Sequence, residues 1–269
     1  MQPRAIVIKA PGTNCDAEMV RGMTLAGASV ELTLLDTLIA EPQRLRDVQL
    51  VGFAGGFSFG DDVASGRMFA VRVREKLYPA LRDAAERGCL IIGACNGFQI
   101  LVQCGLLPGP VSANAGAWPA TPPRQTLALT DNINARFVDR WVGIQPEPGS
   151  ACVWTRGLTD AVAPELRADI LQLPVAHGEG RLVAESPDIL AALEKRGQVA
   201  LRYADNFNGS EGAIAGICDP SGRIFGLMPH PERFLEWTRH PYWTRLPKTA
   251  TSGDTPGVRI FKNAVSALA

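Results

Sequence analysis

The sequence predicts an α/β fold: a mostly parallel, doubly wound sheet with helices on both faces and a small antiparallel extension. Short apolar runs alternate with stretches of helical periodicity up to about Leu107. Beyond Leu107 the apolar runs become crowded and few helical stretches separate them, which favours antiparallel strands. With 46% hydrophobic and 20% charged residues, the chain can bury a full core. We expect residues 1–269 to form a single domain.

The first part of the chain carries the parallel strands. They are predicted from short β-branched or apolar runs at residues 5–8, 29–35, 50–54 and 89–92. A helical pattern follows the first run through Met19 and Met23. A longer helical pattern covers residues 64–87 and is expected to break near Pro79, because proline removes a helical hydrogen bond.

The second part of the chain predicts the remaining sheet. Short strands are expected at residues 125–129, 137–143, 152–155, 171–175 and 181–184. A helix over 185–195 is followed by strands at 199–203, 213–218 and 223–228, with a tight turn at 219–222 between the last two. A helix over 257–268 closes the chain, and residues 248–257 before it are expected to form an exposed loop.

Bulk charge and cysteine usage exclude several classes of function. Lys and Arg total 27, as do Asp and Glu, so no net positive charge favours nucleic acid or an anionic membrane. The six cysteines include no Cys-x-x-Cys pair, which fits neither a disulfide framework nor a zinc knuckle. No apolar run reaches the ~20 residues that span a bilayer, and the N-terminus lacks a signal-peptide layout. We therefore expect a cytoplasmic protein.

The strongest chemical signal is the turn that holds Cys95. An apolar strand ends there and helical spacing begins, with Gly93 and Gly97 two residues to either side. Small residues in these places permit a sharp turn that presents one side chain above the sheet, as at the serine of a nucleophile elbow. The free N–H groups at a helix N-terminus favour a thiolate over a thiol. The alternative is a buried structural cysteine, which we expect for Cys89 and Cys104. Cys15 lies in a similar turn without flanking glycines.

A base for Cys95 is predicted at the end of the strand over 223–228. His230 is followed two residues later by Glu232, and prolines lie on both sides of the histidine. Residues i and i+2 of an extended chain share a face, so Glu232 is expected to orient the His230 ring. The predicted set is a Cys95–His230–Glu232 triad. His177 and Glu179 form a weaker His-x-Glu pair. Two ligands alone are poor evidence for metal, so a substrate-facing or interface loop is favoured and no metal is expected.

These motifs resemble those of the class I, or triad, glutamine amidotransferases. The segments around Cys95 (Gly-Ala-Cys-Asn-Gly-Phe-Gln) and His230 (Met-Pro-His-Pro-Glu-Arg) carry the resemblance. Three further segments, at residues 55–61, 134–141 and 174–181, are similar to the glutaminase subunits of phosphoribosylformylglycinamidine synthases. The resemblance covers nearly the whole chain, from about Ile6 to Phe261.

The resemblance implies a flavodoxin-like sheet, a γ-glutamyl thioester on Cys95 and hydrolysis of L-glutamine to glutamate and ammonia. It implies an oxyanion hole of the Gly56 and Asn96 backbone N–H groups, and it places Gln99 beside the bound glutamine. Ammonia would pass to an ATP-dependent synthase, with or without a small accessory subunit. That synthase converts formylglycinamide ribonucleotide to formylglycinamidine ribonucleotide in purine biosynthesis. ATP and Mg²⁺ are expected on the synthase, and no cofactor is expected in this chain.

Two alternatives remain. The chain could serve another synthetase, such as those that make GMP or CTP, or it could be a non-catalytic scaffold of the same fold. The segments around Asn134 and His177 argue against the first alternative, and the intact triad argues against the second. Because the Gly55-Gly56 turn is flexible by composition, we also expect a partner to order it.

Overall fold

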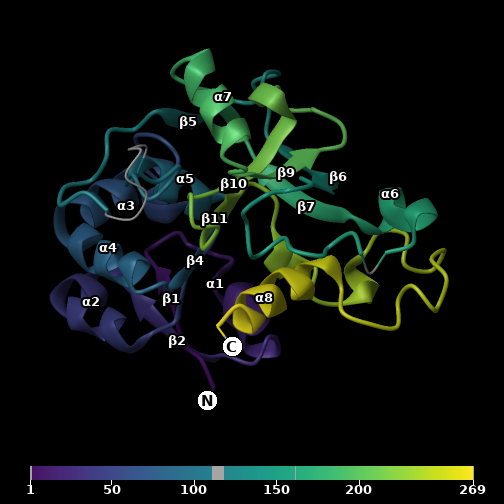
Figure 1. Cartoon of the computed structure of the whole chain (residues 1–269), viewed down its shortest axis with the longest axis horizontal. Coiled ribbons are helices and arrows are strands. Elements are labelled where there is room, and N and C mark those ends of the chain that lie inside the picture. Colours follow the sequence, from purple (N-terminus) through teal and green to yellow (C-terminus); the bar gives the residue numbers. More distant parts are fainter. Residues whose placement is uncertain (1, 111–117, 161, 269) are drawn as a thin grey trace.

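The computed structural model describes residues 2–110, 118–160 and 162–268, and it confirms the α/β fold (Figure 1). A nine-stranded sheet of the described residues has the order β2-β1-β3-β4-β11-β10-β9-β6-β7. Neighbours from β2 to β11 pair in parallel. These strands are β1 (Arg4–Lys9), β2 (Ser29–Leu34), β3 (Leu50–Phe53), β4 (Leu90–Ala94) and β11 (Ile224–Leu227).

The antiparallel extension consists of the other four strands of this sheet. They are β10 (Ile214–Cys218), β9 (Val199–Tyr203), β6 (Val138–Pro146) and β7 (Gln172–His177). Strand β6 pairs with β7 along its first half and with β9 at its end. A separate two-stranded sheet joins β5 (Leu127–Thr130) to β8 (Arg181–Ala184).

Helices cover both faces of the parallel strands. Consecutive strand residues point to opposite faces, and β3 shows what lies on each. Gly52 faces α1 (Asp16–Leu25), because a Cβ there would lie 2.6 Å from the sulfur of Met19. Phe53 faces α3 (Arg67–Arg72), with its ring centroid 5.9 Å from that of Phe69. In Figure 1, α8 (Pro256–Ser266) lies beside α1, where Gly22 lets Phe261 approach closely.

The remaining helices are α2 (Leu35–Ala40), α4 (Tyr78–Glu86), α5 (Asn96–Gln103), α6 (Arg167–Ile170) and α7 (Pro187–Lys195). The described chain contains no helix that is both long and apolar enough to cross a membrane.

Several sequence expectations need correction. Residues 152–155 form an irregular segment that bends into a turn rather than a strand. Leu35 begins α2 instead of ending β2. The helical stretch over 64–87 is interrupted by a π-helical segment, Val73–Leu77, and not by Pro79. Pro79 lies in the first turn of α4, where the N–H that proline lacks would have no helical partner. Thr255, in the predicted exposed loop, is 1% exposed because its hydroxyl caps α8.

Candidate active site

Cys95 is the residue between β4 and α5, and its backbone is strained. Its φ of 52° and ψ of −109° are unusual for a residue with a side chain, and such strain typically costs about 1–3 kcal/mol. The flanking glycines are required for space. A Cβ on Gly93 would lie 2.6 Å from the carbonyl of Gly97, and a Cβ on Gly97 would lie 2.0 Å from the oxygen of Phe53. The predicted strand–turn–helix is confirmed.

Adjacent parallel strands bring the base segment to this turn. The amide of Cys95 donates to the Leu227 carbonyl at the end of β11 (2.8 Å), three residues before His230. The amide of His230 in turn donates to the Pro174 carbonyl on β7 (2.8 Å). Cys95 Sγ lies 3.7 Å from the Ala176 carbonyl oxygen on the same strand. The end of β7 therefore runs along both the thiol and the histidine.

Glu232 contacts His230 as the sequence predicts, by a different local route. Residues Pro231–Arg233 form a 3₁₀ turn instead of continuing an extended chain. This turn places Glu232 Oε1 2.6 Å from His230 Nδ1. Both side chains are almost fully buried, at 2% and 1% exposed. The pair leaves His230 Nε2 without a hydrogen bond among the described residues.

The surroundings favour the protonated form of His230. Burial by itself lowers the pKa of His230, but the Glu232 carboxylate and the Cys95 sulfur outweigh burial and raise this pKa well above its usual value. The imidazolium of His230 therefore lies beside the Cys95 sulfur. It is also a ready proton donor for a leaving group.

The Gly55-Gly56 turn is held in place, contrary to the expectation that it is loose. The Gly55 carbonyl accepts from the amides of Asn14 (3.2 Å) and Cys15 (3.1 Å), next to the start of α1. In a planar trans peptide the N–H points away from the C=O, so these two bonds fix the direction of the Gly56 N–H. Gly55 itself packs on the base, because a Cβ there would lie 2.7 Å from Cε1 of His230. The bonds that hold this turn come from within the chain, and the effect of a partner on it stays a prediction.

Asn96 and Gln99 connect α5 to the surrounding loops. The Asn96 carboxamide accepts from the Ser58 hydroxyl (2.6 Å) and donates to Asp61 (3.1 Å) and to the Gln99 carboxamide oxygen (3.0 Å). Gln99 then donates to the Glu179 carbonyl (2.6 Å). The backbone amide of Asn96 lies in the first turn of α5, where no helical carbonyl is available to it. Gln99 is 3% exposed, and its carboxamide is held between Asn96 and the Glu179 carbonyl.

Cys15 is a residue of this site that sequence reasoning ranked low. A ligand atom of Cys15 lies within 4.8 Å of ligand atoms of His230 and Glu232, a grouping that could hold a metal. However, Arg233 donates to Cys15 Sγ at 3.1 Å, and its positive charge opposes a divalent cation there. His177 and Glu179 bond to separate partners, Asn132 and Ser65. Neither the Cys15–His230–Glu232 cluster nor the His177–Glu179 pair is therefore arranged as a metal centre.

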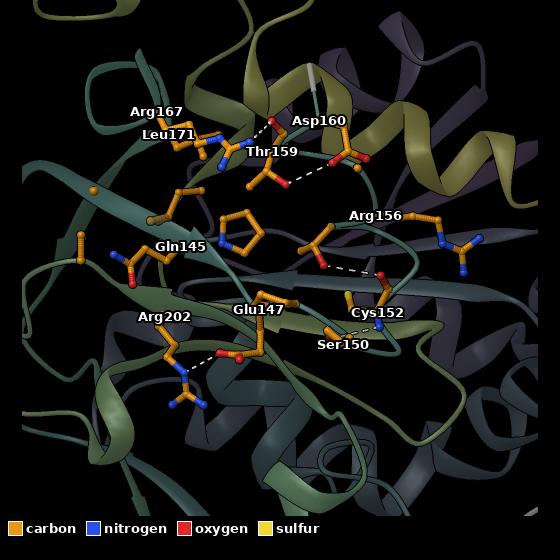
Figure 2. Close-up of a pocket in the computed structure, with 18 of the residues that line it drawn as sticks. Gln145, Glu147, Ser150, Cys152, Arg156, Thr159, Asp160, Arg167, Leu171 and Arg202 are labelled. Carbon is orange, nitrogen blue, oxygen red and sulfur yellow. Dashed lines mark hydrogen bonds and ion pairs between the residues drawn. The ribbon is translucent and has the colours of Figure 1, made fainter. Parts of the chain in front are cut away.

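A pocket of about 1050 Å³ lies away from these residues, beside the end of β6 (Figure 2). Its polar side chains largely bond within its own walls. Arg202 binds Glu147 at 2.6 Å, and Arg167 donates to the Thr159 carbonyl at 3.4 Å. Neither Cys95 nor His230 lines this pocket, so its size alone does not make it the reactive site.

Comparison with known proteins decides the family. The model of the CobB/CobQ-like glutamine amidotransferase domain matches residues 2–266. The chain belongs to this glutamine amidotransferase family. The amidotransferase is 41% identical, over 97% of its length and 96% of the relative's, to phosphoribosylformylglycinamidine synthase subunit PurQ of Dehalococcoides mccartyi. It is 36% identical to the PurQ of Thermotoga maritima, over 88% of its length and 90% of the relative's.

A solved structure agrees with these relatives. The amidotransferase aligns along the full length of both chains with a chain of the PurLQS structure from Thermotoga maritima, at a TM-score of 0.71 and 32% identity. A glutamine amidotransferase from the same organism, at a TM-score of 0.50 and 12% identity, shares the fold.

The Glu232–His230 contact predicts a shift in the pH dependence of this amidotransferase. In Glu232→Gln, the carboxylate that raises the His230 pKa is lost, so that pKa falls. The imidazolium then disappears at lower pH, and the alkaline limb of the kcat/KM profile for glutamine moves toward acid. We expect turnover at neutral pH to fall about 10²-fold, less than in His230→Ala. If the alkaline limb of the Glu232→Gln profile did not move, or if turnover fell as far as in His230→Ala, Glu232 would not have the predicted role of orienting His230.

Proposed function

We propose that this chain is the glutaminase subunit of a phosphoribosylformylglycinamidine synthase, acting as one catalytic domain. The observation that carries the proposal is the strained Cys95 turn beside the buried His230–Glu232 pair. The near-full-length similarity to PurQ subunits supports the choice of synthase. The six cysteines are all free thiols, which supports a reducing, cytoplasmic setting.

Acylation begins when the Cys95 thiolate attacks the carboxamide carbon of glutamine. The charge that develops on the carboxamide oxygen is stabilised by the N–H groups of Gly56 and Asn96. The His230 imidazolium gives its proton to the nitrogen as the C–N bond breaks. Ammonia leaves, and a γ-glutamyl thioester remains on Cys95.

Deacylation uses the same groups in reverse. Neutral His230, oriented by Glu232, takes a proton from a water molecule that attacks the thioester carbon. The same two N–H groups stabilise the oxyanion, and its collapse releases glutamate and restores the Cys95 thiolate. The net reaction converts glutamine and water to glutamate and ammonia. The synthase, which binds ATP and Mg²⁺, then transfers the ammonia nitrogen to formylglycinamide ribonucleotide.

We further propose that the synthase covers an apolar rim made of Phe57, Val63, Ile133 and Phe137. These side chains are 46–75% exposed, and the rings of Phe57 and Phe137 stack 6.3 Å apart. Phe57 follows the Gly56 turn, and Asn132, next to Ile133, bonds the Gly178 carbonyl in the loop that follows β7. A seal on this rim would keep ammonia from solvent. The Pro- and Gly-rich segments 108–123 and 174–181 are also predicted to contact the synthase, and residues 111–117 of the first segment lie outside the described chain.

The rim predicts a binding defect. Ile133→Asp places a charge where the partner buries apolar surface, so we expect association with the synthase to weaken at least tenfold, as measured by sedimentation velocity. Leu32→Asp is the matched control, because Leu32 is 43% exposed on the edge strand β2, away from the rim. Equal affinities for the two variants would remove the rim from the interface.

The function itself is tested by mixing the purified chain with its synthase, ATP, Mg²⁺ and formylglycinamide ribonucleotide. Glutamate should accumulate in step with formylglycinamidine ribonucleotide. If a complex forms but glutamine is not hydrolysed, the proposed glutaminase is wrong. If glutamine is hydrolysed without conversion of the ribonucleotide while conversion of another acceptor proceeds, the choice of synthase is wrong.

A further inference from the structure

Cys15 lies beside the acid–base pair, yet it takes no part in the steps of acylation and deacylation. It is 1% exposed. The sulfur of Cys15, a ring nitrogen of His230 and a carboxylate oxygen of Glu232 all lie within 4.8 Å of one another. Arg233, which follows Glu232 in the 3₁₀ turn, donates to this sulfur at 3.1 Å. Cys15 therefore contacts the segment that carries the base, although 218 positions separate it from Arg233 in the sequence.

The Cys15 sulfur is bonded on two sides. Arg233 can only donate, so the sulfur accepts from it, and the S–H group donates to the Asn14 carboxamide oxygen at 3.2 Å. Sulfur is a weak acceptor, but the positive charge of the guanidinium strengthens the bond. Arg233 thus fixes the Cys15 side chain, and Cys15 in turn bonds the side chain of Asn14.

The backbones of the same two residues hold the oxyanion turn. The amides of Asn14 and Cys15 donate to the Gly55 carbonyl, at 3.2 and 3.1 Å, and these bonds set the direction of the Gly56 N–H. The start of α1 is therefore bonded to the oxyanion turn through its backbone and to Arg233 through a side chain. It connects the two parts of the site that act on the substrate.

The base and the oxyanion donor must keep a fixed separation during the reaction. Gly55 packs on the His230 ring, where a Cβ would lie 2.7 Å from Cε1. Packing of this kind is non-directional, whereas a hydrogen bond has a preferred length and angle. A misplacement of about 1 Å can cost about 10²-fold in rate. A hydrogen-bonded connection between the two segments prevents such a shift.

We propose that the contact between Cys15 and Arg233 aligns the His230–Glu232 pair with the Gly56 N–H group. The inference rests on the proposed glutaminase function and deepens it by naming two positioning residues. Both act through other groups. Arg233 fixes the Cys15 side chain, and the Cys15 amide fixes the turn.

The test measures kcat and KM for glutamine in the complex of the chain with its synthase. In Cys15→Ala and in Arg233→Met, we expect kcat to fall about 10- to 100-fold and KM to change less than about twofold, because binding is kept and alignment is lost. The double variant should lose no more than about threefold beyond the more damaged single variant. An unchanged kcat, or losses that multiply in the double variant, would contradict a shared role.

A second comparison asks whether the contact acts through the oxyanion donor. In Gly56→Ala the donor is already displaced, so loss of the contact has little alignment left to disturb. Adding Cys15→Ala to Gly56→Ala should therefore lower kcat less than about threefold. If kcat falls by the same factor as in the wild-type background, Cys15 supports the fold without aligning these groups, and the proposal is overturned.

Cys15→Ser is the conservative variant. A hydroxyl group can donate to Asn14 and accept from Arg233 as the thiol does, so kcat should stay within about threefold of the wild-type value. If Cys15→Ser lost as much kcat as Cys15→Ala, the hydrogen bonds of this side chain would not be what aligns the site.

The matched control for Arg233→Met is Arg223→Met. Arg223 also connects distant segments, because it donates to the Gly88 carbonyl at 3.1 Å. It precedes β11, at the opposite end of that strand from His230. We expect both variants to lower thermal stability, and Arg223→Met to keep kcat within about twofold of the wild-type value. If Arg223→Met lost as much kcat as Arg233→Met, the loss would be a general effect of instability and the proposal would fall.

Failure of the contact and failure of the function give different results. If the wild-type complex does not hydrolyse glutamine, the glutaminase assignment fails. If it does and Cys15→Ala keeps its kcat, only the role of the contact fails. Should Arg233→Met not fold, the test is completed by Cys15→Ala, by Cys15→Ser and by the combination with Gly56→Ala, since these variants keep Arg233.

Discussion

Replacing Cys95 with alanine is expected to abolish glutamine hydrolysis, with a loss of at least about 10⁴-fold in kcat. Amide cleavage requires the thiolate, and no other group at the turn can form the thioester. The synthase reaction with added ammonia should stay intact in the mutant complex, because ammonia bypasses Cys95. Glutamate release and product formation with ammonia, both measured in the complex, check this result.

Cys89→Ser is the control for the Cys95 variant. Cys89 is buried and burial raises the pKa of its thiol to about 12, so it is not a thiolate near neutral pH. We expect Cys89→Ser to lower stability and to leave turnover nearly unchanged. A folded Cys89→Ser protein that loses hydrolysis as Cys95→Ala does, or a Cys95→Ala protein that keeps it, would show that the nucleophile is misassigned.

Gly56→Ala is expected to cause the second-largest loss. The new Cβ would lie 2.6 Å from the Asn14 amide nitrogen and 2.8 Å from the Gly12 carbonyl oxygen, at a φ of 138° that disfavours a side chain. The turn must shift, and the Gly56 N–H then leaves the position of the oxyanion. We expect kcat for glutamine to fall about 10²–10³-fold, with a smaller change in KM.

The control for Gly56→Ala is Gly27→Ala. Gly27 also has a positive φ, 101°, but a Cβ there meets nothing within 4 Å, and the residue lies just before β2, at the opposite end of the strands from the reactive turn. Thermal unfolding should show some loss of stability for both variants. If Gly56→Ala hydrolyses glutamine as fast as Gly27→Ala, the Gly56 N–H is not an oxyanion donor.

Local sequence signals were sufficient for the parallel half of the fold and for the central part of the candidate site. The glycines around Cys95 and the prolines around His230 are constraints that act within a few residues, so their effects are visible in the sequence. The runs that became β1, β3, β4 and β11 are buried on both faces, which makes them continuously apolar and easy to recognise. The closeness of Cys95 and His230 could also be predicted. Cys95 follows β4 and His230 lies shortly after β11, and adjacent parallel strands end at the same edge of the sheet.

Other features depended on contacts between distant segments. Residues 152–155 look like a strand, yet they are irregular and lead into a turn, because strand formation depends on pairing with a neighbour and not on composition. The Gly55-Gly56 turn looks flexible, yet amides from the first βα turn hold it. Cys15 looks ordinary, yet Arg233, more than two hundred residues later, brings it to the base.

The sequence by itself determined the α/β class, the Cys95 turn and the His230–Glu232 pair, since each is fixed by residues close together in the chain. Only the tertiary structure decided that the Gly56 N–H is held in a fixed direction and that His177 is buried with its Nδ1 against the Asn132 carboxamide oxygen. The reason is physical. The direction of a peptide N–H and the tautomer of a histidine are set by hydrogen-bond partners, and here those partners, Asn14 and Asn132, come from segments that only folding brings together.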